Sequence, residues 1–195
     1  MSIKAVIFDL DGTITQPYFD FDLIRLEMGL AKDSGPILET MAKMNRQQRE
    51  RAEAILYAHE QRAVEASTLN PGAAETLSAL RKAGVLIGIL TRNQRDNAYA
   101  IARKHDLEFD AVVGREDGPV KPDAFGVLHL CRQFGVSPQE TMVVGDFLFD
   151  LLCARSAGAI AVWLKNSNHK QDFTQHADFC IENIAEILEI IAMRR

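Results

Sequence analysis

The chain has 195 residues, of which 47% are hydrophobic and 25% are charged, a balance typical of a globular protein. Its net charge of −5 argues against a nucleic-acid-binding role, since that role usually requires a basic surplus or a basic stripe. No secretory leader and no membrane-spanning stretch is visible, and the three cysteines form no zinc or disulfide pattern, so we expect a cytoplasmic protein without membrane or nucleic-acid partners.

The chain opens with a short apolar run that ends in two carboxylates. Residues 3–8 are apolar apart from Lys4 and predict a buried parallel strand. Asp9 and Asp11 follow directly, and Gly12 frees the backbone to turn sharply. Ligands of open α/β sheets bind outside the carboxyl ends of the strands, so the acids stand where such a fold does its chemistry. An Asp-Gly turn or a helix cap would leave the same pattern, and the pair alone does not separate these interpretations.

The next segment predicts a helical insertion. Residues 20–66 contain no convincing strand. Apolar positions predict a short helix over 21–28, and Pro36 can open a second one. Residues 47–65 are rich in Ala, Glu, Arg and Gln, which are strong helix formers, and predict a third helix. The Asn-Pro-Gly turn at 70–72 closes the insertion.

From residue 73 onward, helices and strands alternate. This alternation predicts βαβ units and a parallel sheet, and right-handed crossovers bring the carboxyl ends of all strands to one edge. The predicted helices cover 73–82, 96–105, 125–134, 148–157 and 184–193. The predicted strands cover 85–90, 111–113, 141–144, 160–164 and 179–181.

Polar residues follow four of these strands, at the edge where the strands end. Asp146 and Asp150 are four residues apart, which puts them on the same side of a helix, one turn from each other. In chain order the residues are Asp9, Asp11, Thr91, Lys121, Asp146 and Asp150.

Each of the later residues has a simpler explanation when it is taken singly. Thr91 can cap the helix that follows, and Lys121 can be a solvated loop residue. Asp146 can belong to a turn, and Asp150 can favour the positive end of a helix dipole. Unrelated polar residues would have to occur by chance at four successive strand ends, so the residues together favour an active site.

This ordered set resembles the four motifs of the haloacid dehalogenase superfamily of phosphohydrolases. The motifs are Asp-Leu-Asp-Gly-Thr at 9–13, an apolar strand ending in Thr91, Lys-Pro at 121–122, and Gly-Asp at 145–146 followed by Asp150. The resemblance implies an α/β fold, with a Rossmann-like doubly wound parallel sheet and a small all-helical cap inserted after the first strand. It assigns residues 1–15 and 71–195 to the core domain and residues 16–70 to the cap.

The resemblance also implies roles in phosphoryl transfer. Asp9 would be the nucleophile that forms an aspartyl-phosphate, and Asp11 would be the general acid and base. Thr91 would hydrogen-bond the phosphoryl group, with Arg92 and Asn93 in the following turn as further substrate contacts. Lys121 would contact the substrate and offset negative charge.

A divalent cation completes the site that the resemblance implies. Carboxylate oxygens suit Mg²⁺, and the expected ligands are Asp9, Asp146 and the backbone carbonyl of Asp11. Asp150 would act from an outer position, by orienting Lys121 or a metal-bound water.

Retention of Asp11 favours a phosphatase, because dehalogenases of this superfamily typically have an aromatic residue there. The expected substrate is a small phosphorylated metabolite. Phosphoglycolate is suggested as the substrate by the position of the cap in the sequence, and not by any particular residue. The loop 30–36 is the expected specificity loop, where Lys32 either meets a substrate anion or is simply solvated. No oligomeric state follows from the residues.

Other functions remain open on the same motifs. A phosphomutase of the β-phosphoglucomutase type shares them, and a phosphonatase would need a Schiff-base lysine, for which Lys32 and Lys43 are the candidates. A non-catalytic sensor or interaction module is a further alternative, and the intact acids at 9 and 11 argue against it.

Overall fold

A computed structural model describes residues 2–166 and 171–194. The chain divides into two compact units. The sheet unit comprises Met1–Pro17 and Thr68–Arg195, and the helical unit comprises Tyr18–Ser67. None of the helices in the described ranges combines the length and the hydrophobicity that crossing a bilayer requires.

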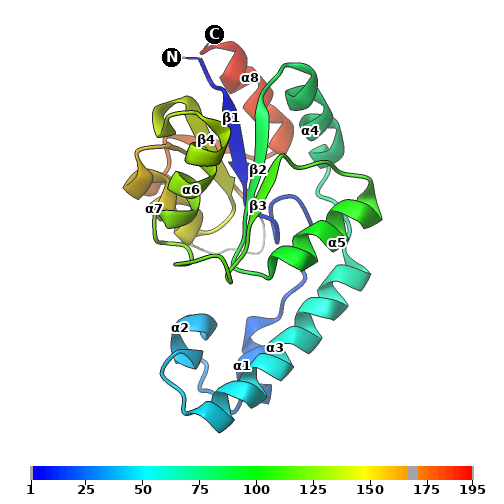
Figure 1. Cartoon of the computed structure of the whole chain (residues 1–195), viewed down its shortest axis with the longest axis vertical. Coiled ribbons are helices and arrows are strands. Elements are labelled where there is room, and N and C mark those ends of the chain that lie inside the picture. Colours follow the sequence, from blue (N-terminus) through cyan, green and yellow to red (C-terminus); the bar gives the residue numbers. More distant parts are fainter. Residues whose placement is uncertain (1, 167–170, 195) are drawn as a thin grey trace. The chain divides into compact units, whose positions relative to one another are not determined.

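The sheet unit is built on a six-stranded parallel sheet with the strand order β3-β2-β1-β4-β5-β6 (Figure 1). The order reverses between β1 and β4, which is the switch point where open α/β sheets bind ligands. The predicted α/β class with a doubly wound parallel sheet is confirmed. The strands are β1 Ala5–Phe8, β2 Leu86–Leu90, β3 Ala111–Val113, β4 Thr141–Gly145, β5 Ile160–Leu164 and β6 Phe179–Ile181.

The register of the central strands sets the positions of the residues that follow them. Phe8, the last residue of β1, pairs with Ile89 of β2 and with Val144 of β4. The backbone N–H of Asp9 continues the ladder by donating to the Val144 carbonyl, 2.9 Å away. The residues after β1, β2 and β4 therefore leave the sheet at one level.

Helices cover both faces of the sheet (Figure 1). α4 (Ala73–Lys82), α5 (Arg95–His105) and α8 (Ile187–Ala192) lie on one face. α6 (Phe125–Phe134) and α7 (Leu148–Ala157) lie on the other face, where they bury Leu130, Leu151 and Cys153 against Ile7 and Val143 of the sheet. Because β1 and β4 are apolar on both sides, they are buried at the centre of this core.

The C-terminal helix differs from the single helix predicted over 184–193. The segment begins with a 3₁₀ turn, Ile184–Glu186, and becomes α-helical only over Ile187–Ala192. The side chain of Asn183 accepts from the N–H of Ala185, and Glu186 accepts from the N–H of Asn183. This capping box satisfies the first N–H groups locally and tightens the first turn.

The helical unit consists of α1 (Phe21–Glu27), α2 (Ile37–Met41) and α3 (Arg46–Ala66). The side chain of Asp20 caps α1, and a capping box between Asn45 and Gln48 starts α3. A small apolar core holds the three helices together, formed by Ile24, Ile37, Met41, Ala52 and Leu56.

Candidate active site

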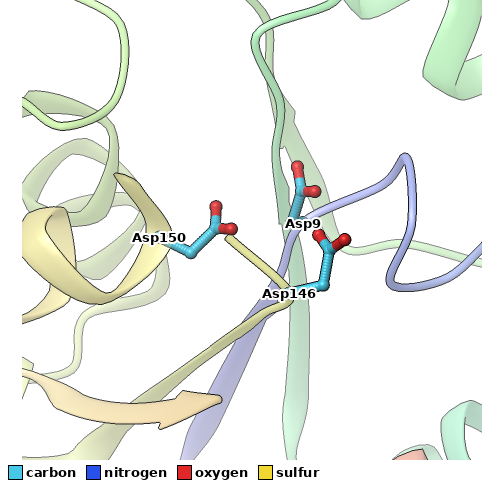
Figure 2. A group of neighbouring side chains, drawn as sticks. All are labelled: Asp9, Asp146 and Asp150. Carbon is cyan, nitrogen blue, oxygen red and sulfur yellow. The ribbon is translucent and has the colours of Figure 1, made fainter. Parts of the chain in front are cut away.

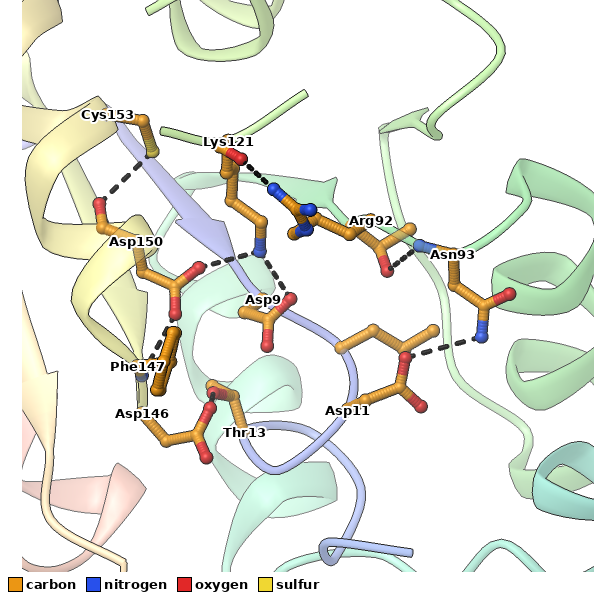
Figure 3. Close-up of polar contacts among 12 residues, drawn as sticks. Asp9, Asp11, Thr13, Arg92, Asn93, Lys121, Asp146, Phe147, Asp150 and Cys153 are labelled. Atoms are coloured by element: carbon orange, nitrogen blue, oxygen red, sulfur yellow. Dashed lines mark hydrogen bonds and ion pairs between the residues drawn. The ribbon is translucent and has the colours of Figure 1, made fainter. Parts of the chain in front are cut away.

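Three buried carboxylates and one buried lysine meet at the carboxyl ends of β1 and β4. Asp9, Asp146 and Asp150 each offer one oxygen, and these oxygens lie within 4.8 Å of one another (Figure 2). Nζ of Lys121 lies 2.5 Å from Oδ1 of Asp9 and 2.6 Å from Oδ1 of Asp150 (Figure 3). All four residues are at most 9% exposed. The structure therefore joins four residues from three segments of the sequence in one charged cluster.

The local backbone explains how Asp150 enters this cluster. Asp150 lies in the first turn of α7, and its Oδ2 accepts from the N–H of Phe147, 3.1 Å away. Its other carboxylate oxygen accepts from Lys121, so both oxygens are held by the chain. A Cβ at position 145 would overlap this carboxyl group, which is why Gly145 is needed at the end of β4.

The cluster holds more negative than positive charge. Burial raises the pKa of Asp9 well above its usual range, although Lys121 lowers it, and the neighbouring acids add to the rise. Burial raises the pKa of Asp150 as well, against the pull of Lys121. Burial alone would lower the pKa of Lys121, but the two carboxylates outweigh this effect and raise that pKa, so the lysine stays charged. One ammonium facing three carboxylates leaves an excess of negative charge that a cation can offset.

Asp146 is held by residues to which the sequence interpretation gave no role. Nδ2 of Asn166 donates to its Oδ2 at 3.0 Å, and Oγ1 of Thr13 lies 3.5 Å from its Oδ1. The indole N–H of Trp163 donates to its backbone oxygen at 3.1 Å. Asn166 follows the end of β5 at the same sheet edge, so the argument applied to the other strand ends could have found it.

A second missed residue is Asn70, which contacts the turn after Asp11. Nδ2 of Asn70 lies 3.0 Å from the carbonyl oxygen of Gly12, 2.8 Å from that of Thr13 and 3.1 Å from that of Thr15. In the sequence, its place before Pro71 indicated only a turn. This contact ties the turn after Asp11 to the segment at which the chain re-enters the sheet unit.

Asp11 and the residues after β2 lie beside the cluster. Asp11 is half-buried, and Nδ2 of Asn93 lies 3.3 Å from its Oδ2 (Figure 3). Oγ1 of the buried Thr91 accepts from the N–H of Asn93 at 3.0 Å. Nη1 of Arg92 donates to the carbonyl oxygen of Lys121, and its guanidinium lies 4.9 Å from the ring centroid of Phe149. These contacts link the residues that follow β2 to the loop that carries Lys121 and to Asp11.

Lys32 lies in the helical unit, apart in sequence from all these residues. Its Nζ lies 3.3 Å from Oδ2 of Asp22, and its side chain is 82% exposed. Such an exposed pair contributes little to stability and leaves the ammonium free to exchange partners. The contact of Lys32 with a substrate stays a prediction.

Replacing Gly12 with alanine should distort the site. Gly12 has φ of +92°, and a Cβ there would overlap Oδ2 of Asp146. Gly84 is a matched control, since it has φ of +73° and open space around its Cβ position. Gly84→Ala should cost only backbone strain, about 1 kcal/mol. Gly12→Ala should lower the melting temperature further and strongly reduce turnover. Equal melting temperatures and full activity in both variants would show that the turn tolerates a side chain beside Asp146.

Comparison with known proteins gives one consistent family. Residues 3–158 match the haloacid dehalogenase-like hydrolase family. An uncharacterized hydrolase of Saccharomyces cerevisiae is 31% identical, with 97% of this chain and 91% of that protein covered. A phosphoglycolate phosphatase of Chromobacterium violaceum is 26% identical, with coverages of 97% and 96%. The crystal structure of a hydrolase from Pseudomonas syringae superposes with a TM-score of 0.81 at 22% identity, with coverages of 97% and 98%, and shows the same fold.

Proposed function

The chain belongs to the haloacid dehalogenase-like hydrolase family, and we propose that it is a phosphatase that hydrolyses a small phosphorylated metabolite through an aspartyl-phosphate. The observation that carries this proposal is the contact of Lys121 with both Asp9 and Asp150, beside Asp146 at the switch point of the sheet. The similarity to a phosphoglycolate phosphatase over nearly the whole chain supports the reaction class.

The first step transfers the phosphoryl group to the chain. A carboxylate oxygen of Asp9 attacks phosphorus, and the bond between phosphorus and the leaving oxygen breaks. Asp11, in its acid form, gives its proton to the leaving alkoxide. Lys121, which contacts Asp9 in the free protein, offsets the negative charge of the incoming phosphoryl group. Thr91, Arg92 and Asn93 are proposed as further contacts for its oxygens.

The second step releases phosphate and restores the acids. Asp11, now a carboxylate, takes a proton from a water molecule as the water oxygen attacks the phosphorus of the aspartyl-phosphate. The bond between phosphorus and Asp9 breaks, and inorganic phosphate leaves. Asp11 is then protonated again and Asp9 is again a carboxylate, so the cycle closes without any other reactant than water.

The residues fit a divalent cation. Three buried carboxylates with one ammonium carry the excess charge that a cation would neutralise, and oxygen ligands suit Mg²⁺. We propose Asp9, Asp146 and the backbone carbonyl of Asp11 as its ligands. Oδ1 of Asp150 accepts from the Lys121 ammonium and its Oδ2 from the N–H of Phe147. The partners of the Asp146 oxygens are neutral side chains, one of them 3.5 Å away, so an outer role is proposed for Asp150 rather than for Asp146. When bound, Mg²⁺ would neutralise phosphoryl charge.

The two units suggest separate roles in catalysis and in substrate binding. We propose the sheet unit as the catalytic domain and the helical unit as a cap that supplies substrate contacts, with Lys32 as a candidate. The helical unit occurs in the sequence where phosphatases with small helical caps carry their insertion. Phosphoglycolate is the first substrate to test, because a relative of nearly full coverage carries that name.

A turnover screen tests this function. Purified protein with Mg²⁺ is given p-nitrophenyl phosphate and a panel of alkyl phosphates that includes phosphoglycolate, glycerol phosphate and sugar phosphates, and released phosphate is measured. We expect steady phosphate release from several of these compounds. Isomerised product with only slow release of phosphate would instead identify a phosphomutase, and no reaction with any compound would contradict the proposal.

Metal removal should silence the enzyme reversibly. Without a cation the excess negative charge of the cluster would repel a phosphate dianion, so EDTA should reduce turnover by about 100-fold or more. Added Mg²⁺ should restore the rate, while added K⁺ at the same ionic strength should not. Full activity in EDTA after exhaustive dialysis would remove the proposed metal role from Asp146.

A further inference from the structure

Hydrogen bonds connect the side chains of Asn97, Asn93 and Asp11 in a line. Nδ2 of Asn97, in the first turn of α5, lies 2.8 Å from Oδ1 of Asn93. Nδ2 of Asn93 lies 3.3 Å from Oδ2 of Asp11 (Figure 3). Asn93 is 5% exposed and Asn97 is 4% exposed. Because both amides are buried, their orientation is set by partners within the protein.

The side chain of Asn93 has one orientation. Its Oδ1 receives a second hydrogen bond from the N–H of Gln94, 2.7 Å away. Two donors on one atom identify that atom as the oxygen, so the NH₂ group must face Asp11. The backbone of Asn93 is fixed as well, since its N–H donates to Thr91 and its carbonyl accepts from the N–H of Arg115 at 3.0 Å.

This orientation determines the roles of the two Asp11 oxygens. The NH₂ group of Asn93 can only donate, so Oδ2 of Asp11 must accept. The carbonyl oxygen of a carboxylic acid is a better acceptor than its hydroxyl oxygen, so this contact favours the proton of the acid form on Oδ1. That proton passes to the leaving alkoxide in the first step of the proposed reaction, and a proton from water returns to Asp11 in the second.

We propose that Asn97 is a positioning residue for this proton transfer, acting on Asp11 through the side chain of Asn93. The proposal rests on the proposed function, which assigns the transfer to Asp11. Asn97 keeps the oxygen of Asn93 turned toward α5 and its NH₂ group turned toward Asp11. Without Asn97 the amide of Asn93 loses one of the two donors that oppose rotation, so its NH₂ group holds Oδ2 of Asp11 less firmly.

A purely structural role predicts a different result. If Asn97 only ties the start of α5 to the preceding turn, its loss should slow the reaction of every substrate equally. If it acts through the general acid, the loss should depend on the leaving group. An alkoxide needs a proton to leave, whereas p-nitrophenolate leaves without one.

The test compares kcat/KM of Asn97→Ala with that of the wild type on p-nitrophenyl phosphate and on the fastest alkyl phosphate of the panel. kcat/KM covers the steps up to phosphoryl transfer, so the later hydrolysis does not affect it. We expect a loss of about tenfold on the alkyl phosphate and less than about twofold on the aryl phosphate, since one hydrogen bond is at stake. Arg103→Ala, an exposed change on α5, should alter neither value.

Two further variants complete the test. Asn97→Asp keeps the size of the side chain but removes the donor, and it should reproduce the selective loss if Asn97→Ala is unstable. In an Asp11→Asn background, Asn97→Ala should cause no further loss on the alkyl phosphate. Equal losses on both substrates, or an undiminished effect in that background, would overturn the role of Asn97. A wild type inactive on every phosphate ester would instead overturn the proposed function itself.

Discussion

Asp9→Asn should abolish turnover, with a loss on the order of 10⁴-fold or more on any phosphate ester. The neutral amide cannot attack phosphorus, and no aspartyl-phosphate can then form. The measurement is phosphate release under saturating substrate and Mg²⁺. Asp106→Asn is a suitable control, because Asp106 is exposed and its φ of +54° lies in a region that asparagine tolerates. The control should retain wild-type activity, and near-normal turnover by Asp9→Asn would show that another residue is the nucleophile.

The same variant should be more stable than the wild type when metal is absent. The pKa of Asp9 is raised in the folded state by burial, so its ionised form costs folding free energy. This cost is present at pH values above the folded pKa and disappears as the pH falls toward the unfolded value, about 4. In EDTA at pH 8, Asp9→Asn should therefore melt at a higher temperature than the wild type. The difference should vanish near pH 4, and a lower melting temperature at pH 8 would contradict this account of the charge cluster.

Lys121→Met should destabilise the protein by about 3–5 kcal/mol in EDTA at neutral pH. Lys121 contacts two of the three buried carboxylates directly, and methionine fills a similar volume without a charge. Turnover should fall by about 100-fold or more, because positive charge near the phosphoryl group is lost. Urea unfolding and phosphate release measure the two effects.

The loss of stability should also depend on pH in a defined direction. Without Lys121, the pKa values of Asp9 and Asp150 rise further above their unfolded values, so lowering the pH protonates both acids and restores stability. Lys82→Met removes an exposed lysine from the last turn of α4 and should change stability by less than about 0.5 kcal/mol. Lys121→Arg keeps the charge and should recover part of the stability. A loss for Lys121→Met no larger than that for Lys82→Met would mean that the cluster is not held by this ion pair.

The fold could be predicted because its signals are local. Apolar runs such as 5–8 and 160–164 are typical of buried central strands, and glycines such as Gly135 and Gly158 end helices in the left-handed conformation. The 3₁₀ turn at Ile184 was missed because it depends on how Asn183 and Glu186 share the first N–H groups, which helical periodicity does not reveal.

The charge cluster was visible for a similar reason. Parallel strands with right-handed crossovers bring strand ends together, so Asp9, Lys121 and Asp146 could be expected at one edge. The contacts of Asn70 and Asn97 could not be read in the same way, whereas Asn166 follows a strand end and could have been expected at that edge. Asparagine is common in turns and near helix starts, and only the folded chain shows which groups each amide contacts.

Detection of the covalent intermediate shows directly whether Asp9 attacks the substrate. Wild-type protein and Asp9→Asn are mixed with substrate and Mg²⁺, quenched in acid within the first turnovers and digested, and the peptides are analysed by mass spectrometry. We predict a phosphoryl group on the peptide that contains Asp9, labile to hydroxylamine as an acyl phosphate should be, and none in Asp9→Asn. A phosphoryl group on any other residue, or rapid turnover by wild type with none on Asp9, would show that this aspartate does not attack the substrate.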